Sequence, residues 1–396
     1  MKKITLLISF SFLLLVCCAP SKDKSETNGE NQEIDSLVSE TGKIKFTDRD
    51  SVQDDLARFI SGLPQNHSTS RYQKFEKEKY WQAYKGRIDK SWLELYENRL
   101  LPIRTWDTSI FHYYKVDTLP LFYPLSGPDF LHAYVLYPKT ETFILLALEP
   151  IHDLPAIENL NIDNQRIYLQ SIESSLQDIF NKSYFITTHM QDDLQHAKVK
   201  GVLPLFYFFM SRSALEIRRT EQITLDTAGN IQNTHEYQRG LVQGIRIIFK
   251  DGDKEKTLIY FRSNISDIGI KRTPELMMFL EKLGPINTFI KSASYMPHYS
   301  TFSVLRNFML NKSQSIFQDD TGIPYKYFKS NKKFQTVLFG KYAQPVKDFG
   351  DYVFQKDLDS AFRDTISIRQ LPFHLGYHWG DKKQAYILTR RKAEIK

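Results

Sequence analysis

The first twenty residues constrain this chain more than any other segment. Met1-Lys2-Lys3 gives a short basic start, and the stretch from Ile4 to Val16 is apolar apart from one Thr and two Ser residues. The run from Ala19 to Asp23 then turns polar. An apolar stretch of this length is too short for an ordinary membrane-spanning helix but typical of a secretory signal peptide. We therefore expect a signal peptide over residues 1–17.

The two cysteines of the chain, Cys17 and Cys18, both lie at the end of this signal. If Cys18 carries a lipid, the mature fold has no free thiol, which excludes disulfides, cysteine zinc sites and a cysteine nucleophile. The fold must then be stabilised by its core alone. The roughly 350 remaining residues are ample for one large domain or two moderate ones.

The segment Leu15-Val16-Cys17-Cys18 resembles the lipobox of bacterial lipoproteins. In that motif a Leu lies three positions before the Cys that is lipidated and becomes the new N-terminus. Cys18 fits this pattern, and Cys17 is the alternative, which would put Val16 in the position that prefers a small residue. The resemblance implies a palmitate-bearing lipoprotein attached to the membrane of the cell envelope, in the outer membrane.

Residues 18–45 form a predicted flexible tether behind the lipid. The stretch Ser21–Glu33 has no apolar residue and so cannot bury surface. Its start, Ser21-Lys22-Asp23, resembles the Lys/Asp/Glu signal that follows the lipid-bearing Cys in surface-exposed lipoproteins of the Bacteroidetes. This resemblance implies a position facing outward from the cell.

The charge of the chain gives no sign of a nucleic-acid partner. Of 53 basic residues, Lys2 and Lys3 lie in the signal, which leaves 51 against 46 acidic residues and a net charge of +5. The excess is scattered in short clusters such as Arg218-Arg219 and Lys332-Lys333. There is no basic helix and no basic stripe with interleaved aromatic residues, so we expect no nucleic-acid binding.

Residues 46–115 form a predicted helical N-terminal segment. Ser51 followed by Asp54 resembles a capping box, and Gly62 with Pro64 ends a first short helix. A second helix is indicated by large apolar residues at three- and four-residue steps, which predict a face packed in the core. These residues are Trp81, Tyr84, Ile88, Trp92 and Leu95.

Residues 116–396 form a predicted α+β (or mixed α/β) body with a mixed sheet and flanking helices. The apolar run Thr142–Leu148 predicts a strand buried on both faces, and 203–210 is a buried run that fits either a helix or a strand. The remaining pattern predicts strands at 219–225, 244–249, 257–262, 334–339 and 384–389, and helices at 162–180, 274–283 and 302–310.

This body has two stretches with a similar order of features, which predicts two related halves, 116–265 and 266–396. In each, a Tyr lies seven residues before a Phe, and a helix, a strand and an acidic loop ending in an apolar residue and Pro follow. Tyr123 and Phe130 begin the first stretch, and Tyr295 and Phe302 begin the second. The alternative is chance, because short α–β units recur often. A true duplication predicts a cleft between the halves.

The most distinctive candidate for chemistry is the stretch Tyr123–Phe130, which reads Tyr-Pro-Leu-Ser-Gly-Pro-Asp-Phe. Asp129 lies just before a predicted helix, where it either caps the helix or presents a catalytic carboxylate beside Ser126 and His132. The stretch resembles a segment shared by a group of uncharacterised bacterial envelope lipoproteins, and so does the later Gln318–Pro324 segment. That group has no assigned reaction, so the resemblance implies a fold and no activity.

Three further acids are candidate catalytic residues. Glu149 ends the most apolar strand, and Asp319 and Asp320 lie at the comparable place in the second stretch. Groups beyond the carboxyl ends of strands face the ligand crevice of open sheets. Together with Asp129 they predict paired carboxylates for glycoside hydrolysis or oxygen ligands for a hard cation. The structural alternative is turn chemistry and a buried ion pair.

His374, His378 and Trp379 form a candidate ligand-lining cluster near the C-terminus, with core packing as the alternative. His189, Asp193 and His196 have a spacing that can bind a transition metal, but their polar neighbours favour a solvated face. We therefore expect no metal and no cofactor.

The sequence predicts a lipid-anchored cell-envelope protein that acts in binding or in envelope structure, with a glycan or an envelope protein as partner. The alternative is a carboxylate-dependent hydrolase acting on a glycan or another envelope polymer. An enzyme needs two of the candidate acids close together in a concave pocket with shifted pKa values, whereas a binding protein does not.

Overall fold

The computed structural model describes residues 51–182, 184–185, 199–237, 240–365, 368–378 and 385–392. The predicted lipidation site Cys18, the tether, His189, Asp193, His196 and Trp379 lie outside these residues, and the side chain of His378 is not described.

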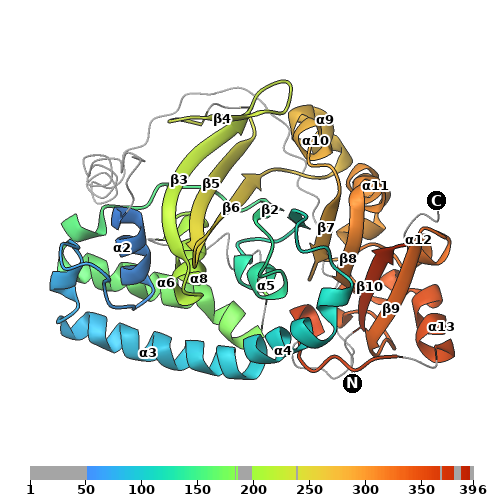
Figure 1. Ribbon diagram of the computed structural model, residues 1–396, viewed down its shortest axis with the longest axis horizontal. Helices are drawn as coiled ribbons and strands as arrows, with labels where there is room; N and C mark the ends of the chain where they lie inside the picture. Colours follow the sequence, from blue (N-terminus) through green and yellow to red (C-terminus); the bar gives the residue numbers. More distant parts are fainter. Residues whose placement is uncertain are drawn as a thin grey trace, which may run out of the picture. The chain divides into compact units, whose positions relative to one another are not determined.

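The described strands form one mixed sheet of ten strands, which confirms the predicted fold class (Figure 1). The strand order is β4-β3-β5-β6-β2-β1-β7-β8-β10-β9. The strands are β1 (Leu121–Pro124), β2 (Thr142–Ala147), β3 (Glu216–Leu225), β4 (Ile231–Asn233), β5 (Gln243–Asp251), β6 (Lys254–Arg262), β7 (Ile286–Ile290), β8 (Ser313–Asp319), β9 (Phe334–Gly340) and β10 (Ala385–Arg391).

Five neighbouring strands, β6, β2, β1, β7 and β8, run parallel to one another, and antiparallel strands extend the sheet at both ends. On one side β5 pairs antiparallel with β6, and on the other β10 pairs antiparallel with β8 and β9. The carboxyl ends of the five parallel strands therefore meet at a single edge of the sheet.

Helices cover both faces of the sheet. They are α2 (Ser51–Ile60), α3 (Lys79–Leu95), α4 (Leu101–Ser109), α5 (Phe130–Leu136), α6 (Ile162–Lys182), α8 (Leu203–Arg212), α9 (Asp267–Arg272), α10 (Pro274–Glu281), α11 (Ser303–Lys312), α12 (Lys326–Lys329) and α13 (Lys356–Asp364). One core holds buried residues of α2 to α8, and a second core on the other face holds those of α9 to α12. In Figure 1, α9, α10 and α11 lie beside one another, away from α3 and α6.

The side chains of β2 alternate between the two cores. Phe143 and Leu145 join the core of α5, whereas Ile144 and Leu146 join the core of α11. This alternation explains why the run 142–147 is apolar at every position from Phe143 onward, since a strand covered on both faces has no polar side.

The helical N-terminal part packs directly on the sheet. Trp106 of α4 contacts Phe317 of β8 and Phe339 of β9, each with ring centroids 5.3 Å apart. On α3, Trp81, Tyr84, Ile88 and Leu95 are buried as the stripe predicts. None of the helices in the described ranges combines the length and the apolar composition that crossing a bilayer requires.

The Asp54 side chain bonds across the fold. Its carboxylate accepts a hydrogen bond of 3.0 Å from the backbone N–H of Ile217 in β3. This hydrogen bond of Asp54 joins α2 to the sheet. In a capping box, the Asp54 side chain would instead bond to the backbone at the start of its own helix.

The two predicted repeat units appear as β1–α5–β2 and β7–α11–β8, each a strand, a helix and a parallel strand. Their outer neighbours differ, because β6 runs parallel to β2 whereas β10 runs antiparallel to β8. The duplication itself stays a prediction.

Candidate functional site

A pocket of about 490 Å³ lies at the carboxyl ends of β6, β2, β1 and β7. The two central strands, β1 and β7, are neighbours, but their following helices α5 and α11 belong to the cores on opposite faces. Such a reversal leaves a crevice between the two crossover connections, which is where open α/β sheets bind ligands. The volume lies within the range of small-molecule sites.

The turn after β1 forms one wall of the pocket. Leu125 and Gly127 both adopt left-handed backbone, with φ of 59° and 55°, and Ser126 between them donates from its N–H to the Leu146 carbonyl of β2. Left-handed backbone is uncommon for a residue such as Leu and is often kept at functional sites. The turn leads directly into α5, with Asp129 as the N-cap residue.

The Asp129 carboxylate is buried and fully partnered. Its oxygens lie 2.6 Å from Lys291 Nζ, 2.8 Å from His132 Nδ1 and 3.0 Å from the Tyr123 hydroxyl, and the His132 backbone N–H donates the cap hydrogen bond. Burial opposes the charged form, but the contacts with His132 and Lys291 outweigh it and hold the pKa of Asp129 below its usual range. Burial also lowers the pKa values of His132 and Lys291. Asp129 thus both caps α5, as predicted, and ties it to the end of β7.

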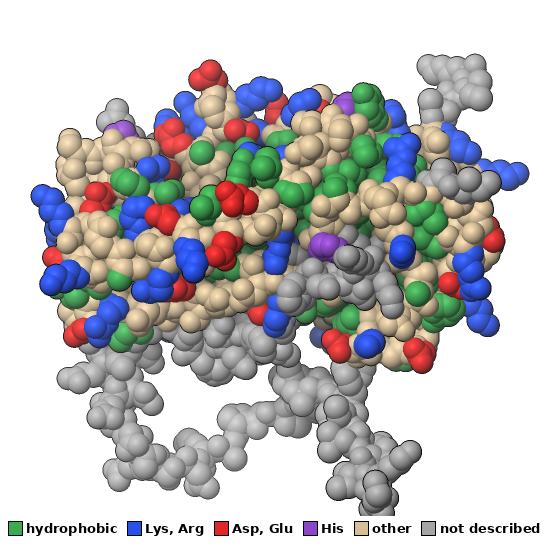
Figure 2. Space-filling view, turned by 90° about the horizontal axis from the view of Figure 1, so that it is seen from below, with side chains coloured by type: hydrophobic (Ala, Val, Ile, Leu, Met, Phe, Trp, Pro, Cys, Tyr) green, Lys and Arg blue, Asp and Glu red, His purple; other side chains and the backbone are tan. Residues whose placement is uncertain are grey.

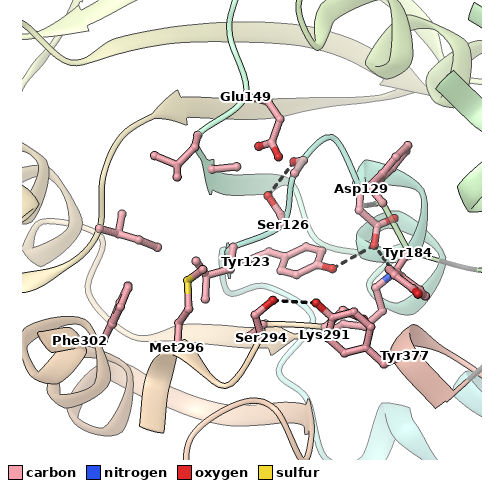
Figure 3. A pocket seen from close by; sticks show the side chains of 18 of the residues that line it. Tyr123, Ser126, Asp129, Glu149, Tyr184, Lys291, Ser294, Met296, Phe302 and Tyr377 are labelled. Atoms are coloured by element: carbon pink, nitrogen blue, oxygen red, sulfur yellow. Dashed lines mark hydrogen bonds and ion pairs between the residues drawn. The ribbon is translucent and has the colours of Figure 1, made fainter. Parts of the chain in front are cut away.

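Glu149 is buried with an unsatisfied oxygen. It follows the end of β2 with only 4 % of its surface exposed, and its Oε2 has no hydrogen-bond partner among the described residues. Burial raises the pKa of the Glu149 carboxyl, against the backbone N–H groups of Glu149 and Leu148 and the charge of Arg262. Figure 3 shows this carboxyl group directed from the end of β2 toward Ser126 and the interior of the pocket.

The loop after β7 forms the opposite wall. Ser292, Ser294 and Tyr295 all have left-handed backbone, with φ between 50° and 56°. The Ser294 hydroxyl lies 2.7 Å from the Tyr377 hydroxyl, which Figure 3 marks across the pocket wall. Left-handed backbone at three non-glycine residues of one loop costs free energy, and it persists where the surrounding structure holds the loop in place.

Asp319 and Asp320 hold this loop in place and do not line the pocket. Asp319 accepts from the Ser292 N–H at 2.8 Å, and Asp320 accepts from the Tyr295 hydroxyl at 2.5 Å. Of the four candidate acids, the structure therefore brings Asp129 and Glu149 to the pocket and places Asp319 and Asp320 behind its wall.

The rest of the pocket is apolar and aromatic. Met296 and Phe302 lie on the side opposite Asp129 and Lys291 (Figure 3). An aromatic group formed by Tyr184, Phe349 and Tyr377 completes the lining, with ring centroids 4.8 Å apart for Tyr184–Tyr377 and 5.4 Å for Phe349–Tyr377.

Sequence reasoning missed several pocket residues, and His374 is the one member of the predicted C-terminal cluster whose side chain the structure describes. Lys291, Ser292 and Ser294 follow β7, a strand that the pattern did not reveal. Tyr377, which the predicted C-terminal cluster did not include, lines the pocket, whereas His374 is half-buried outside it. The sequence signal that could have pointed to Lys291 is its position directly after Ile286–Ile290, a run that begins and ends with apolar residues.

No group of three His, Cys, Asp or Glu side chains suited to a metal ion occurs in the part of the chain that the structure describes. Comparison of the chain with protein families, curated proteins and solved structures gives no match. What the chain does must therefore be argued from the pocket itself.

Proposed function

We propose that this chain is a small-molecule-binding protein of the cell envelope, anchored through a lipid on Cys18. The observation that carries the proposal is the position of the pocket, which lies where the helices that follow the neighbouring parallel strands β1 and β7 belong to opposite faces of the sheet. The lipobox and tether residues support the envelope location.

The construction of the pocket supports a preformed binding site. Its floor is the fully partnered Asp129–Lys291 pair, and one wall is the strained loop after β7, held by Asp319 and Asp320. A site whose groups are held before the ligand arrives loses less conformational entropy on binding.

The outer surface supports the expectation of no nucleic-acid partner. Figure 2 shows Lys and Arg side chains interspersed with Asp and Glu over the visible face. A surface of mixed sign lacks the continuous basic field that attracts a phosphate backbone.

A ligand screen with a matched pair of variants tests the proposal. Leu148 is 50 % exposed at the pocket, and Leu93 is 55 % exposed on α3, away from it. Leu148→Trp narrows the pocket, whereas Leu93→Trp adds the same bulk elsewhere. We expect thermal-shift screening of the full chain against a chemically diverse metabolite library to find compounds that stabilise the wild type and Leu93→Trp but not Leu148→Trp. No such compound, or equal stabilisation of both variants, would overturn the proposal.

A second candidate function is hydrolysis of a glycan or another envelope polymer. It is favoured by opposite pKa shifts of two pocket carboxyls, since the pKa of Glu149 is raised and the pKa of Asp129 is lowered. Such a pair is the usual arrangement of a general acid and an ionised partner. Mass spectrometry of glycan oligomers incubated with wild type and Glu149→Gln decides it, because hydrolysis predicts products that the variant does not form.

A further inference from the structure

Among the described charged residues of the pocket, Glu149 has a carboxyl oxygen without a hydrogen-bond partner. A buried carboxylate without a counter-charge is unfavourable, and native structures pair such groups with few exceptions. Asp129, an equally buried acid of the same pocket, has Lys291, His132 and Tyr123 as partners. Glu149 Oε2 has none among the described residues.

The charges around the pocket favour a cation over an anion. Lys291 is the only basic residue among the described residues that line the pocket, and its ammonium group lies 2.6 Å from Asp129. The remaining charged lining residues are both acidic, the buried Glu149 and the exposed Asp348. Arg262 lies outside the lining and donates to the Leu148 carbonyl at 3.2 Å. An anionic ligand would therefore find no basic side chain in the described lining other than Lys291, which is already paired with Asp129.

The aromatic residues of the pocket suit the same chemistry. The ring of Tyr377 contacts the rings of both Tyr184 and Phe349, and Phe185 also lines the pocket. Aromatic faces attract ammonium groups, and they also bury an apolar body.

We infer that the ligand of this pocket is an organic amine that binds as a cation, with its ammonium group on Glu149 and an apolar or aromatic body against the aromatic residues. The inference rests on the proposed binding function and specifies its ligand class. A cation would supply the partner that Glu149 Oε2 lacks. The raised pKa of the Glu149 carboxyl agrees with this, because burial is its main cause and outweighs the backbone N–H groups and the charge of Arg262.

Shape-matched probes of different charge test the inference. Phenethylamine, tyramine and tryptamine are the cations, and each is compared with its neutral propyl-arene and its propionate analogue. Isothermal titration calorimetry uses the full chain in detergent, as wild type, Glu149→Gln and Asp348→Asn. Glu149→Gln keeps the shape of the side chain and removes its charge, and Asp348→Asn is the control for an exposed lining carboxylate.

We expect at least one amine to bind the wild type at least tenfold more tightly than its neutral and anionic analogues. Glu149→Gln should abolish this preference, while Asp348→Asn should keep most of it and both variants should melt no lower than the wild type. An equal affinity for the neutral analogue, or a preference that survives in Glu149→Gln, overturns the inference.

The failure of the inference is distinguishable from that of the binding function. If no amine binds but library compounds of another class protect the wild type and not Leu148→Trp, the amine assignment is wrong and the binding function stands. If neither the amines nor the library bind, both are wrong.

Discussion

At the scale of single residues, Asp129 and Glu149 show how environment separates two acids of one pocket. Both are almost fully buried, with 1 % and 4 % of their surface exposed. Asp129 has an ammonium, an imidazole and a phenol around it, whereas Glu149 Oε2 has no hydrogen-bond partner in the described part of the chain. The first acid holds the fold together, and the second is available to a ligand.

This contrast predicts opposite effects of substitution on stability. Asp129→Ala removes the carboxylate that lies 2.6 Å from the buried Lys291 ammonium group, so we expect the free energy of unfolding to fall by about 3–5 kcal/mol. Glu149→Gln removes the charge of a buried carboxyl whose Oε2 has no hydrogen-bond partner among the described residues, so we expect the free energy of unfolding to stay equal or to rise. Urea unfolding followed by circular dichroism measures both. A Glu149→Gln variant as unstable as Asp129→Ala would show that Glu149 is structural.

At the scale of elements, the loop after β7 gains its shape from the strand beside it. The Tyr295 hydroxyl donates to Asp320 at the end of β8 and accepts from the Val346 N–H at 2.9 Å. Asp319 of the same strand accepts from the loop N–H of Ser292. These contacts hold left-handed residues that would otherwise relax, and so preserve the pocket wall.

Removing the Tyr295 hydroxyl should therefore weaken the fold. Tyr295→Phe leaves the buried Asp320 carboxylate short of a donor, and we expect a loss of about 1–3 kcal/mol in the free energy of unfolding. The matched control is Tyr299→Phe, because the Tyr299 hydroxyl lies 3.3 Å from the hydroxyl of the exposed Tyr352 and Tyr299 itself is 40 % exposed. We expect the control to change stability by less than about 0.5 kcal/mol. Equal losses in the two variants would contradict the role of Tyr295.

At the scale of the whole molecule, the helices before β1 and the sheet form a shared core. Trp106 packs on strands β8 and β9, and Asp54 of α2 bonds to the backbone of β3. These contacts lie toward opposite ends of the strand order, so the helical segment contributes to the stability of the body as a whole.

Asp54 links this stability to pH. Burial raises the pKa of the Asp54 carboxyl from 3.8 to about 6, against the hydrogen bond from Ile217 and the charge of Arg58. Because the unfolded chain ionises first, this residue makes the wild type less stable as pH rises from about 4 to about 6, by up to about 3 kcal/mol in total. Asp54→Asn keeps a side-chain oxygen that can accept from the Ile217 N–H, but its amide does not ionise, so the variant does not lose this stability as pH rises.

Chemical unfolding at pH 4, 5, 6 and 7 checks the pH effect. We expect Asp54→Asn to gain stability over the wild type progressively up to about pH 6 and to keep a constant advantage above it. A constant difference over the whole range would show that Asp54 does not titrate there.

Much of the fold followed from local patterns. The apolar run 142–147 became a strand in both cores, and the predicted helices at 162–180 and 274–283 appear as α6 and α10. The ambiguous run 203–210 is helix α8, with Pro204 in its first turn. Strand β1 escaped prediction because it has four residues and ends in Pro124, and β7 because Asn287 and Thr288 interrupt its apolar pattern.

The sequence by itself determined the element types of the longer segments, the capping role of Asp129 and the position of Glu149 next to a strand end. Only the tertiary structure decided that β1 pairs with β7, and this pairing brings Asp129 to Lys291 and creates the pocket. The physical reason is that helix periodicity and capping depend on neighbours in the chain, whereas parallel pairing depends on burial between distant segments. For the same reason Asp319 and Asp320, which looked like catalytic acids in the sequence, turned out to hold the pocket wall from the strand beside it.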